Sequence, residues 1–239
     1  MNEVTQILEN RMNMYRFLSR FFIVEADATF LEGIAKMTLP QETGEEKLER
    51  GYRAIEAWVK KNVTEKADPD PVTTLAADYA HVFLGAGVSG AKAAYPFESV
   101  YTSPQGLVMQ DAWEEVCAIY HKNGFARPQG GDNHEDHIGL QLDFMAHLCE
   151  RDLALIDKDD AESAKALAQN FATEEAFLQK HLLNWVSGLA RDVHKYAETT
   201  FYPGAVDALE GFLKLDKSMV DEFAKVSAQA LESLDATEA

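Results

Sequence analysis

The sequence predicts an all-α protein in which residues 1–239 form one globular domain of about ten helices. Apolar residues recur at intervals of three and four positions along most of the chain, which is the spacing that gives a helix one buried face. Strand-like alternation of apolar and polar residues, bounded by turn signals, is absent from the sequence. Hydrophobic residues make up 46% of the 239, so one continuous core can be buried.

Proline and glycine divide this periodic pattern into separate helices. The stretch ADPDP at 67–71 ends one helix, and Pro71 suits the first turn of the next. Residues 85–99 carry three glycines and a proline, so they form a long loop, and a second loop follows at 123–133. The helices are expected at 2–24, 27–38, 43–63, 71–84, 104–123, 135–156, 159–179, 180–199, 202–214 and 216–235.

The charge of the chain restricts its partners. Lys and Arg number 22 against 40 Asp and Glu, which gives a formal net charge of -18 at pH 7. Nucleic acid is excluded as a partner, because phosphate binding needs clustered cations. An acidic surface favours cationic partners and also keeps a protein in solution.

The two cysteines and the N-terminal segment indicate a location. Cys117 and Cys149 form no C-x-x-C motif, which argues against a disulfide scaffold or a thiolate zinc site. The first helix has early acids, arginines inside its apolar part and no small-residue cleavage site, so it is not a signal peptide. No run of about 18 apolar residues could span a membrane. The cytoplasm is therefore the expected location.

The stretch NHEDHIGLQLDFMAHLCER, residues 133–151, has three alternative interpretations. The first is a metal site, and the second is a helix N-terminus capped by its acids. The third is a carboxylate and imidazole pair that binds a ligand from a partly exposed position. His134 and His137 are three apart and no H-E-x-x-H pattern exists, which disfavours zinc. The candidate caps are Asp132, Asn133 and Asp136. A metal-dependent helical phosphohydrolase would use His134, Asp136, His137 and His147.

Other catalytic signals are weak or missing. No G-x-S-x-G or P-loop motif occurs. The segment GAGVSG at 85–90 is rich in glycine, but no strand precedes it and no Lys-Ser or Lys-Thr pair closes it. It is therefore a poor candidate for a phosphate-binding loop.

Several separated blocks resemble the TorD/DmsD family of cytoplasmic maturation chaperones. The first block is DYAHVFLGAG followed by YPFESVY, the second is HEDHIGLQLDFM, and the third is FLQKHLLNWVSGLARDVHKYAETTFYPGAVDAL. Together they cover roughly residues 75–213 in the family's order. Asn133 and His134 stand where the family signature has Glu and Pro, and Tyr79 and Phe97 replace aromatic residues that are often Trp.

The resemblance implies a non-enzymatic chaperone without a cofactor of its own. Proteins of this family bind the twin-arginine signal peptide and the immature catalytic subunit of a molybdenum-cofactor oxidoreductase, and they hold it until the cofactor is inserted. Asp136 would then bind guanidinium, and aromatic residues would line a groove for the apolar part of the peptide. The signal-peptide residues implied by the motifs are Tyr79, Val82, Phe83, Pro96, Phe97, Ser99, Tyr101, Asp136 and His137.

The resemblance leaves several alternatives open. Periodicity alone places Phe83 in the core, Ser99 can cap a short helical turn, and His181 and Trp185 are expected to be core residues. Weak binding of a guanine nucleotide has been suggested for the family. Hinges at 67–71 and 123–134 would allow either a monomer or a domain-swapped dimer. The client oxidoreductase is not specified.

Overall fold

The computed structural model describes residues 3–87, 93–127, 131, 133–158 and 160–238. The predicted all-α class is confirmed, since the described residues contain helices and a single isolated β-bridge. None of these helices has the length and apolar character needed to cross a membrane. The helices are α1 Glu3–Ile23, α2 Ala28–Lys36, α3 Glu46–Val59, α4 Pro71–Leu84, α5 Glu98–Thr102, α6 Asp111–Lys122, α7 Ile138–Leu155, α8 Ala161–Phe177, α9 Val186–Tyr196 and α10 Phe201–Glu238, with π-helical turns η1 Lys60–Thr64 and η2 Leu178–Leu182.

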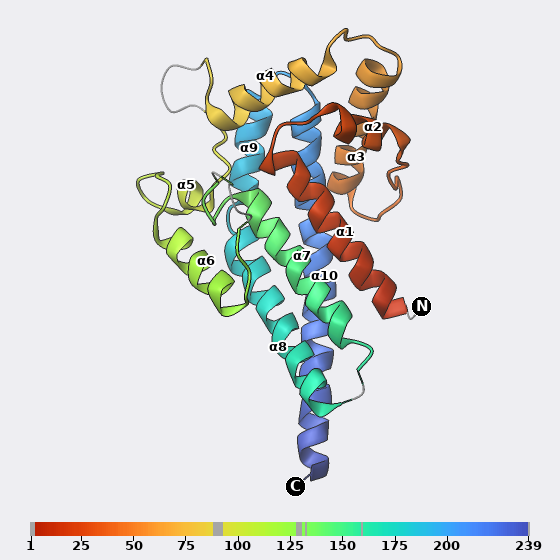
Figure 1. Ribbon diagram of the computed structural model, residues 1–239, viewed down its shortest axis with the longest axis vertical. Helices are drawn as coiled ribbons and strands as arrows, with labels where there is room; N and C mark the ends of the chain where they lie inside the picture. The colour runs from red at the N-terminus through yellow and green to blue at the C-terminus, as the bar shows by residue number, and fades with distance from the viewer. Residues whose placement is uncertain (1–2, 88–92, 128–130, 132, 159, 239) are drawn as a thin grey trace.

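The long helix α10 organises the molecule. It runs along the long axis, with α7 and α8 in front of it and the N-terminal helices beside it (Figure 1). Its main packing partners are α3 and α8, while α1 packs mainly against α7. The two ends of the chain are thereby built into one helical body, and α5 and α6 lie along its edge (Figure 1).

Glycines permit the close approach of α3 to α10. A Cβ atom at Gly51 would lie 2.4 Å from the backbone N of Ala208 and 2.5 Å from the carbonyl O of Gly204. Both obstacles are backbone atoms of α10, which a rotamer change cannot remove. Any side chain at Gly51 therefore forces these two helices apart.

A buried ionic cluster joins α1 to α8 and α10. Arg11 donates to Glu174 at 2.6 Å and to Asp216 at 2.6 and 3.1 Å, and Tyr15 also donates to Asp216 at 2.5 Å. Asp152 of α7 lies beside Glu174 of this cluster. Burial and the neighbouring Glu174 carboxylate raise the pKa of Asp152 well above its usual range. Buried charges are tolerated only when they are paired and hydrogen-bonded, so this cluster fixes α1 in one position against α8 and α10.

The expected helix 104–123 begins later in the structure. It starts at Asp111, because the chain at Gly106 and Met109 has φ angles of 63° and 57°. The left-handed region stops a right-handed helix from continuing. The start that was expected at 104 is therefore wrong, while the end near 122 agrees.

The predicted break between 214 and 216 is also wrong, since α10 is continuous through Asp216. Asp216 is buried within this helix, where Arg11 and Tyr15 satisfy its carboxylate. The helix expected at 180–199 likewise begins later. The turn η2 and Trp185 precede α9, which starts at Val186.

The predicted helix 71–84 agrees with α4. Pro71 is its first residue, and the Asp70 side chain accepts from the backbone N–H of Thr73 at 3.2 Å. The segment 67–70 connects η1 to this helix, and its role as a hinge stays a prediction. The second predicted hinge, 123–134, lies partly outside the described residues. Residues 88–90 of the glycine-rich segment 85–90 also lie outside them.

Candidate functional site

The first two motif blocks meet in space. Phe97 and His137 form an antiparallel bridge, in which Ile138 N–H donates to the Pro96 carbonyl at 2.9 Å. The Glu98 N–H donates to the Asp136 carbonyl at 3.0 Å. We call residues 95–99 and 134–138 the motif junction. Five of the nine predicted site residues lie in the motif junction: Pro96, Phe97, Ser99, Asp136 and His137. Tyr101 follows it in α5.

Asp136 supports the motif junction from inside. It is 0% exposed, and its Oδ2 accepts from Ser99 N–H at 2.9 Å, while Oδ1 is buried without a hydrogen-bond partner in the described part of the chain. The expectation that this carboxylate faces a ligand from a partly exposed place is wrong for the structure described. Its hydrogen bond fixes the first turn of α5 instead.

His137 is the N-cap of α7. Its Nδ1 accepts from Gly139 N–H at 3.0 Å, and its side chain is buried. Burial lowers the pKa of His137 to about 3, so the imidazole is neutral at physiological pH. The expected exposure is therefore wrong, and the cap is this histidine instead of Asn133 or Asp136. The third candidate cap, Asp132, lies outside the described residues.

Ser99 connects the motif junction to the segment before α6. Its Oγ accepts from Gln110 N–H at 3.2 Å. The Gln110 side chain in turn donates to the carbonyls of Val108 at 2.9 Å and Met109 at 3.3 Å. Ser99 is fully buried, so it cannot contact a ligand directly and acts by holding this segment.

A second polar network lies behind α5. The buried Glu98 accepts from Gln141 at 2.5 Å, and His181 Nδ1 lies 3.1 Å from the same carboxylate. Trp185 donates to the His181 carbonyl at 2.7 Å and stacks on Tyr101 with ring centroids 5.4 Å apart. The expected burial of His181 and Trp185 is confirmed.

The remaining motif residues divide between core and surface. Val82 and Phe83 are buried, and the Phe83 ring packs on Phe22 and Tyr202 at 5.9 and 5.3 Å. These two side chains belong to the core, as periodicity alone predicted for Phe83. Pro96 is buried, whereas Phe97 and Tyr101 are partly exposed.

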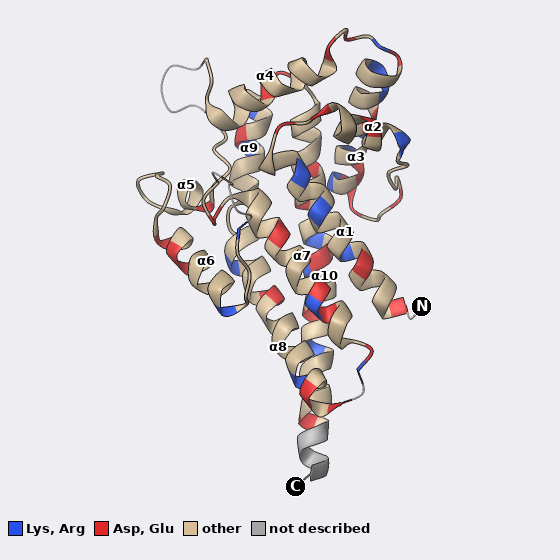
Figure 2. Cartoon of the chain, viewed as in Figure 1, with Lys and Arg blue, Asp and Glu red and all other residues tan. Residues whose placement is uncertain are grey.

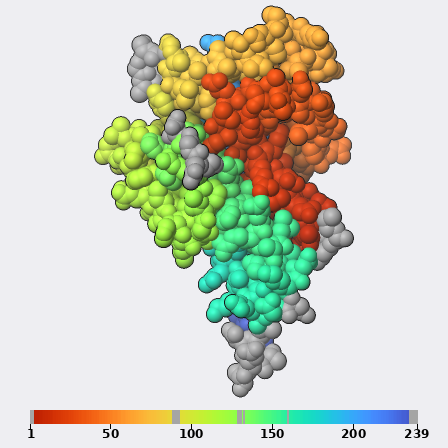
Figure 3. Space-filling view, viewed as in Figure 1, coloured from red at the N-terminus to blue at the C-terminus, as the bar shows by residue number. Residues whose placement is uncertain are grey.

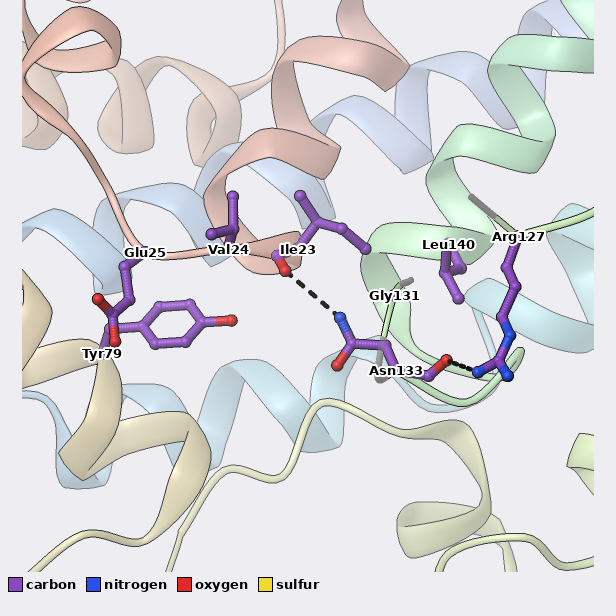
Figure 4. Close-up of a pocket in the computed structure, with 8 residues that line it drawn as sticks. All are labelled: Ile23, Val24, Glu25, Tyr79, Arg127, Gly131, Asn133 and Leu140. Carbon is purple, nitrogen blue, oxygen red and sulfur yellow. Dashed lines mark hydrogen bonds between the residues drawn. The ribbon is translucent and has the colours of Figure 1, made fainter. Parts of the chain in front are cut away.

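Tyr79 lines an open cleft of about 370 Å³ between the end of α1, α4 and the loop before α7 (Figure 4). Its hydroxyl donates to the Phe22 carbonyl at 2.7 Å, and burial raises the pKa of Tyr79 to about 12. The ring therefore serves as a neutral, aromatic wall. The cleft is lined by Ile23, Val24, Glu25, Tyr79, Arg127, Gly131, Asn133 and Leu140.

Glu25 supplies an exposed carboxylate to this cleft (Figure 4). Within the described part of the chain, its side chain has no hydrogen bond or ion pair. Arg20, the nearest basic residue in sequence, already pairs with Asp27 at 2.8 Å. Arg127 on the opposite wall donates to the Asn133 carbonyl at 3.0 Å and lies 3.7 Å from Glu135.

Motif matching missed Glu25 and its apolar neighbours Ile23, Val24 and Leu140. A signal was present in the sequence, because Glu25 directly follows the apolar helix end FFIV and precedes another helix.

The metal-site alternative finds no support in the geometry. His147 packs on the Phe125 ring at 5.5 Å, whereas His134 packs on Phe97 at 5.9 Å. His137 uses its Nδ1 for the helix cap. Across the residues that the structure describes, no three His, Cys, Asp or Glu side chains are grouped to hold a metal ion.

The described residues thus form a helical body in which an open, partly apolar cleft lies beside a buried, hydrogen-bonded polar junction. Comparison with known sequences identifies the family of the chain. A family model described as "Nitrate reductase delta subunit" matches residues 41–191. The chain belongs to this family, which includes the TorD chaperones.

Curated relatives extend the similarity over almost the whole chain. Chaperone protein TorD of Vibrio vulnificus (strain YJ016) is 26% identical over 217 residues, covering 90% of this chain and 97% of the relative. The Vibrio cholerae protein of that name (strain O395) is 27% identical over 235 residues, covering 93% and 97%. The Photobacterium profundum protein is 29% identical over 166 residues, covering 70% and 73%. These relatives are named as chaperones and not as enzymes, which agrees with the prediction of a non-enzymatic protein.

Proposed function

We propose that this protein is a cytoplasmic chaperone that binds the twin-arginine signal peptide and the immature catalytic subunit of a molybdenum-cofactor oxidoreductase. Binding holds the subunit until its cofactor is inserted and covers the signal peptide until then. Membership in a family of maturation chaperones supports the general role. The observation that carries the specific proposal is the unpaired carboxylate of Glu25 in an apolar cleft.

The cleft matches the chemistry of such a peptide. A guanidinium group forms short, charge-assisted hydrogen bonds with a carboxylate, and Glu25 is free to accept them. The Tyr79 ring and the apolar side chains of Ile23, Val24 and Leu140 contact the alkyl part of an arginine and the residues after it.

The motif residues then divide into two roles. Phe97 and Tyr101 are partly exposed, and Tyr79, although largely buried, lines the cleft, so these three are proposed to contact the peptide. The other motif residues are buried and are proposed to position the loops that form the binding surface: Val82, Phe83, Pro96, Ser99, Asp136 and His137. This division keeps the predicted set but assigns the guanidinium to Glu25 instead of Asp136.

Isothermal titration calorimetry tests the proposal with a synthetic peptide that carries two consecutive arginines followed by an apolar segment. Glu25→Gln keeps the side-chain shape and removes the charge, so we expect binding to weaken about 10- to 100-fold. Replacing both arginines by lysine should weaken binding to the wild-type protein. Glu32→Gln, at an exposed glutamate on α2, is the matched control and should bind as the wild type does.

Asp136→Asn separates the two assignments of the carboxylate. Asparagine retains an oxygen for Ser99 N–H, so binding should stay near the wild-type value if Asp136 only positions the loop. A large loss with Asp136→Asn and none with Glu25→Gln would return the guanidinium to Asp136. Failure of the wild-type protein to bind the peptide would remove the proposed function, and displacement of bound peptide by GTP would place a guanine nucleotide in the same cleft.

A further inference from the structure

Three consecutive apolar side chains are exposed between α5 and α6. Leu107, Val108 and Met109 are 56%, 38% and 45% exposed. Single exposed apolar residues are common on protein surfaces. Three in succession are unusual on a well-packed chain and indicate an interaction site. We call residues 107–109 the apolar edge.

The apolar edge is held in a defined conformation. Met109 has a φ of 57°, a left-handed conformation that is unfavourable for a residue with a side chain. Such strain persists only where the surroundings impose it, and it concentrates at functional sites. Here the constraint is the pair of hydrogen bonds from the Gln110 side chain to the carbonyls of Val108 and Met109, together with Leu107 N–H donating to Ser103 Oγ at 3.3 Å.

The constraint originates in the motif junction. Asp136 holds Ser99 N–H, and Ser99 Oγ holds Gln110 N–H. A continuous path of hydrogen bonds thus connects the buried carboxylate of the second motif block to the exposed apolar edge. This path gives a physical role to two motif residues that have no exposed surface of their own.

Acidic residues adjoin the apolar edge. Asp111 and Glu114 are exposed in the first turn of α6, and neither has an ion-pair partner among the residues described. Figure 2 shows acidic residues where α6 begins. The combination of an apolar contact with uncompensated negative charge favours an apolar segment that is flanked by a basic residue, and it repels an acidic one.

The apolar edge and the cleft belong to one side of the fold. Trp113 on α6 donates to Glu135 at 2.6 Å, and Glu135 pairs with Arg127, which lines the cleft. In Figure 3 the yellow-green atoms of this region form a projecting edge of the molecule. These contacts connect α6 to the wall of the cleft.

We propose that the apolar edge, Leu107–Met109, is the docking contact for the apolar segment of the client signal peptide, with Asp111 and Glu114 attracting a basic residue beside that segment. The inference rests on the proposed function, because it assigns a second part of the same peptide. The arginines occupy the cleft at Glu25, and the apolar segment lies against the edge.

A double-mutant cycle tests the assignment with the same calorimetric assay. The triple variant Leu107→Ser, Val108→Ser, Met109→Ser should weaken binding of the arginine peptide by about tenfold or more, because three apolar contacts are lost. A peptide whose apolar segment is replaced by serine should bind the wild-type protein more weakly, and the triple variant should then cause no further loss. Met37→Ser with Val226→Ser, exposed apolar residues elsewhere, is the control and should bind as the wild type does.

The outcomes separate the two proposals. If the triple variant binds the arginine peptide as tightly as the wild type while Glu25→Gln binds weakly, the apolar edge is not the contact and the proposed function stands. Additive losses from the triple variant and the serine peptide would likewise overturn the docking contact. If the wild-type protein does not bind the arginine peptide at all, both proposals fail. An unchanged thermal unfolding midpoint of the triple variant confirms that the substitutions leave the fold intact.

Discussion

Polar side chains in the motif junction bind backbone groups of the protein itself. Asp136 accepts from Ser99 N–H, and His137 accepts from Gly139 N–H. Their burial removes water as an alternative partner, so each bond fixes the loop that contains it. These motif residues therefore indicate where a site lies, but their buried side chains are not the atoms that would contact a ligand. Glu25 and the apolar edge, which carry no motif, provide accessible atoms.

The neutral imidazole of His137 makes stability depend on pH. Its pKa is about 3 in the folded protein against 6.5 when exposed, so below pH 6.5 the unfolded chain binds a proton that the folded chain does not. This contribution to the free energy of unfolding is therefore complete above about pH 6.5 and falls progressively toward pH 3. At pH 5 the wild type should have lost about 2 kcal/mol from this group.

Urea unfolding at pH 7 and pH 5 measures this effect. His137→Asn keeps a side-chain acceptor for the helix cap but does not titrate. Carboxylates elsewhere titrate in both proteins, so the difference between the two pH dependences isolates the imidazole. A wild-type loss equal to that of His137→Asn would show that His137 is protonated in the folded protein.

At the scale of helices, the sequence predicted class and order better than boundaries. Pro71 and Asp70 marked the start of α4 correctly, because both residues act within a few positions of themselves. The late start of α6 depends on Met109, whose left-handed φ is imposed by hydrogen bonds to Gln110 that no local pattern reveals. The continuity of α10 depends on Asp216 meeting Arg11 from the other end of the chain.

Contacts between distant parts of the sequence also explain why only part of the candidate site could be predicted. The motif blocks predicted that Phe97 and His137 belong to one location, and the bridge between them agrees. Burial of Asp136 was not predicted, because a carboxylate is usually exposed and its partner Ser99 is 37 positions away. Whether the predicted set binds a signal peptide stays a prediction.

The contact between α3 and α10 gives a test at the scale of helix packing. Gly51→Ala places a Cβ within 2.5 Å of the α10 backbone, so we expect a loss of about 2 to 3 kcal/mol in the free energy of unfolding. Gly33→Ala on α2 meets no atom within 4 Å and should gain about 0.5 to 1 kcal/mol from helix propensity. Chemical denaturation of both variants makes the comparison. Equal effects of the two substitutions would show that the helices are not in contact at Gly51.

At the scale of the whole molecule, the net charge of -18 acts on encounter more than on final affinity. A cationic peptide is attracted over distances near the Debye length, which is about 10 Å at 0.1 M salt. The acidic residues in Figure 2 are distributed over several helices, so the attraction concerns the molecule as a body.

Stopped-flow kinetics of the arginine peptide should reflect this attraction. Raising the salt concentration from about 0.02 M to about 0.2 M should lower the association rate constant by roughly tenfold, with a smaller change in the dissociation rate constant. A peptide with the same apolar segment and no net charge is the control, and its association rate should be nearly independent of salt. An association rate of the arginine peptide that is flat across this range would exclude steering by the acidic surface.

The Arg11 cluster has a consequence for how the chain is made. Arg11 leaves the ribosome early, whereas its partner Asp216 lies 205 positions later. Until α10 has been synthesised, α1 carries a guanidinium whose principal carboxylate is missing, and its apolar face has no complete core to enter. A nascent chain that ends before α10 therefore cannot close the helical body. Helix α10 must therefore be synthesised before α1 can take its final position in the helical body.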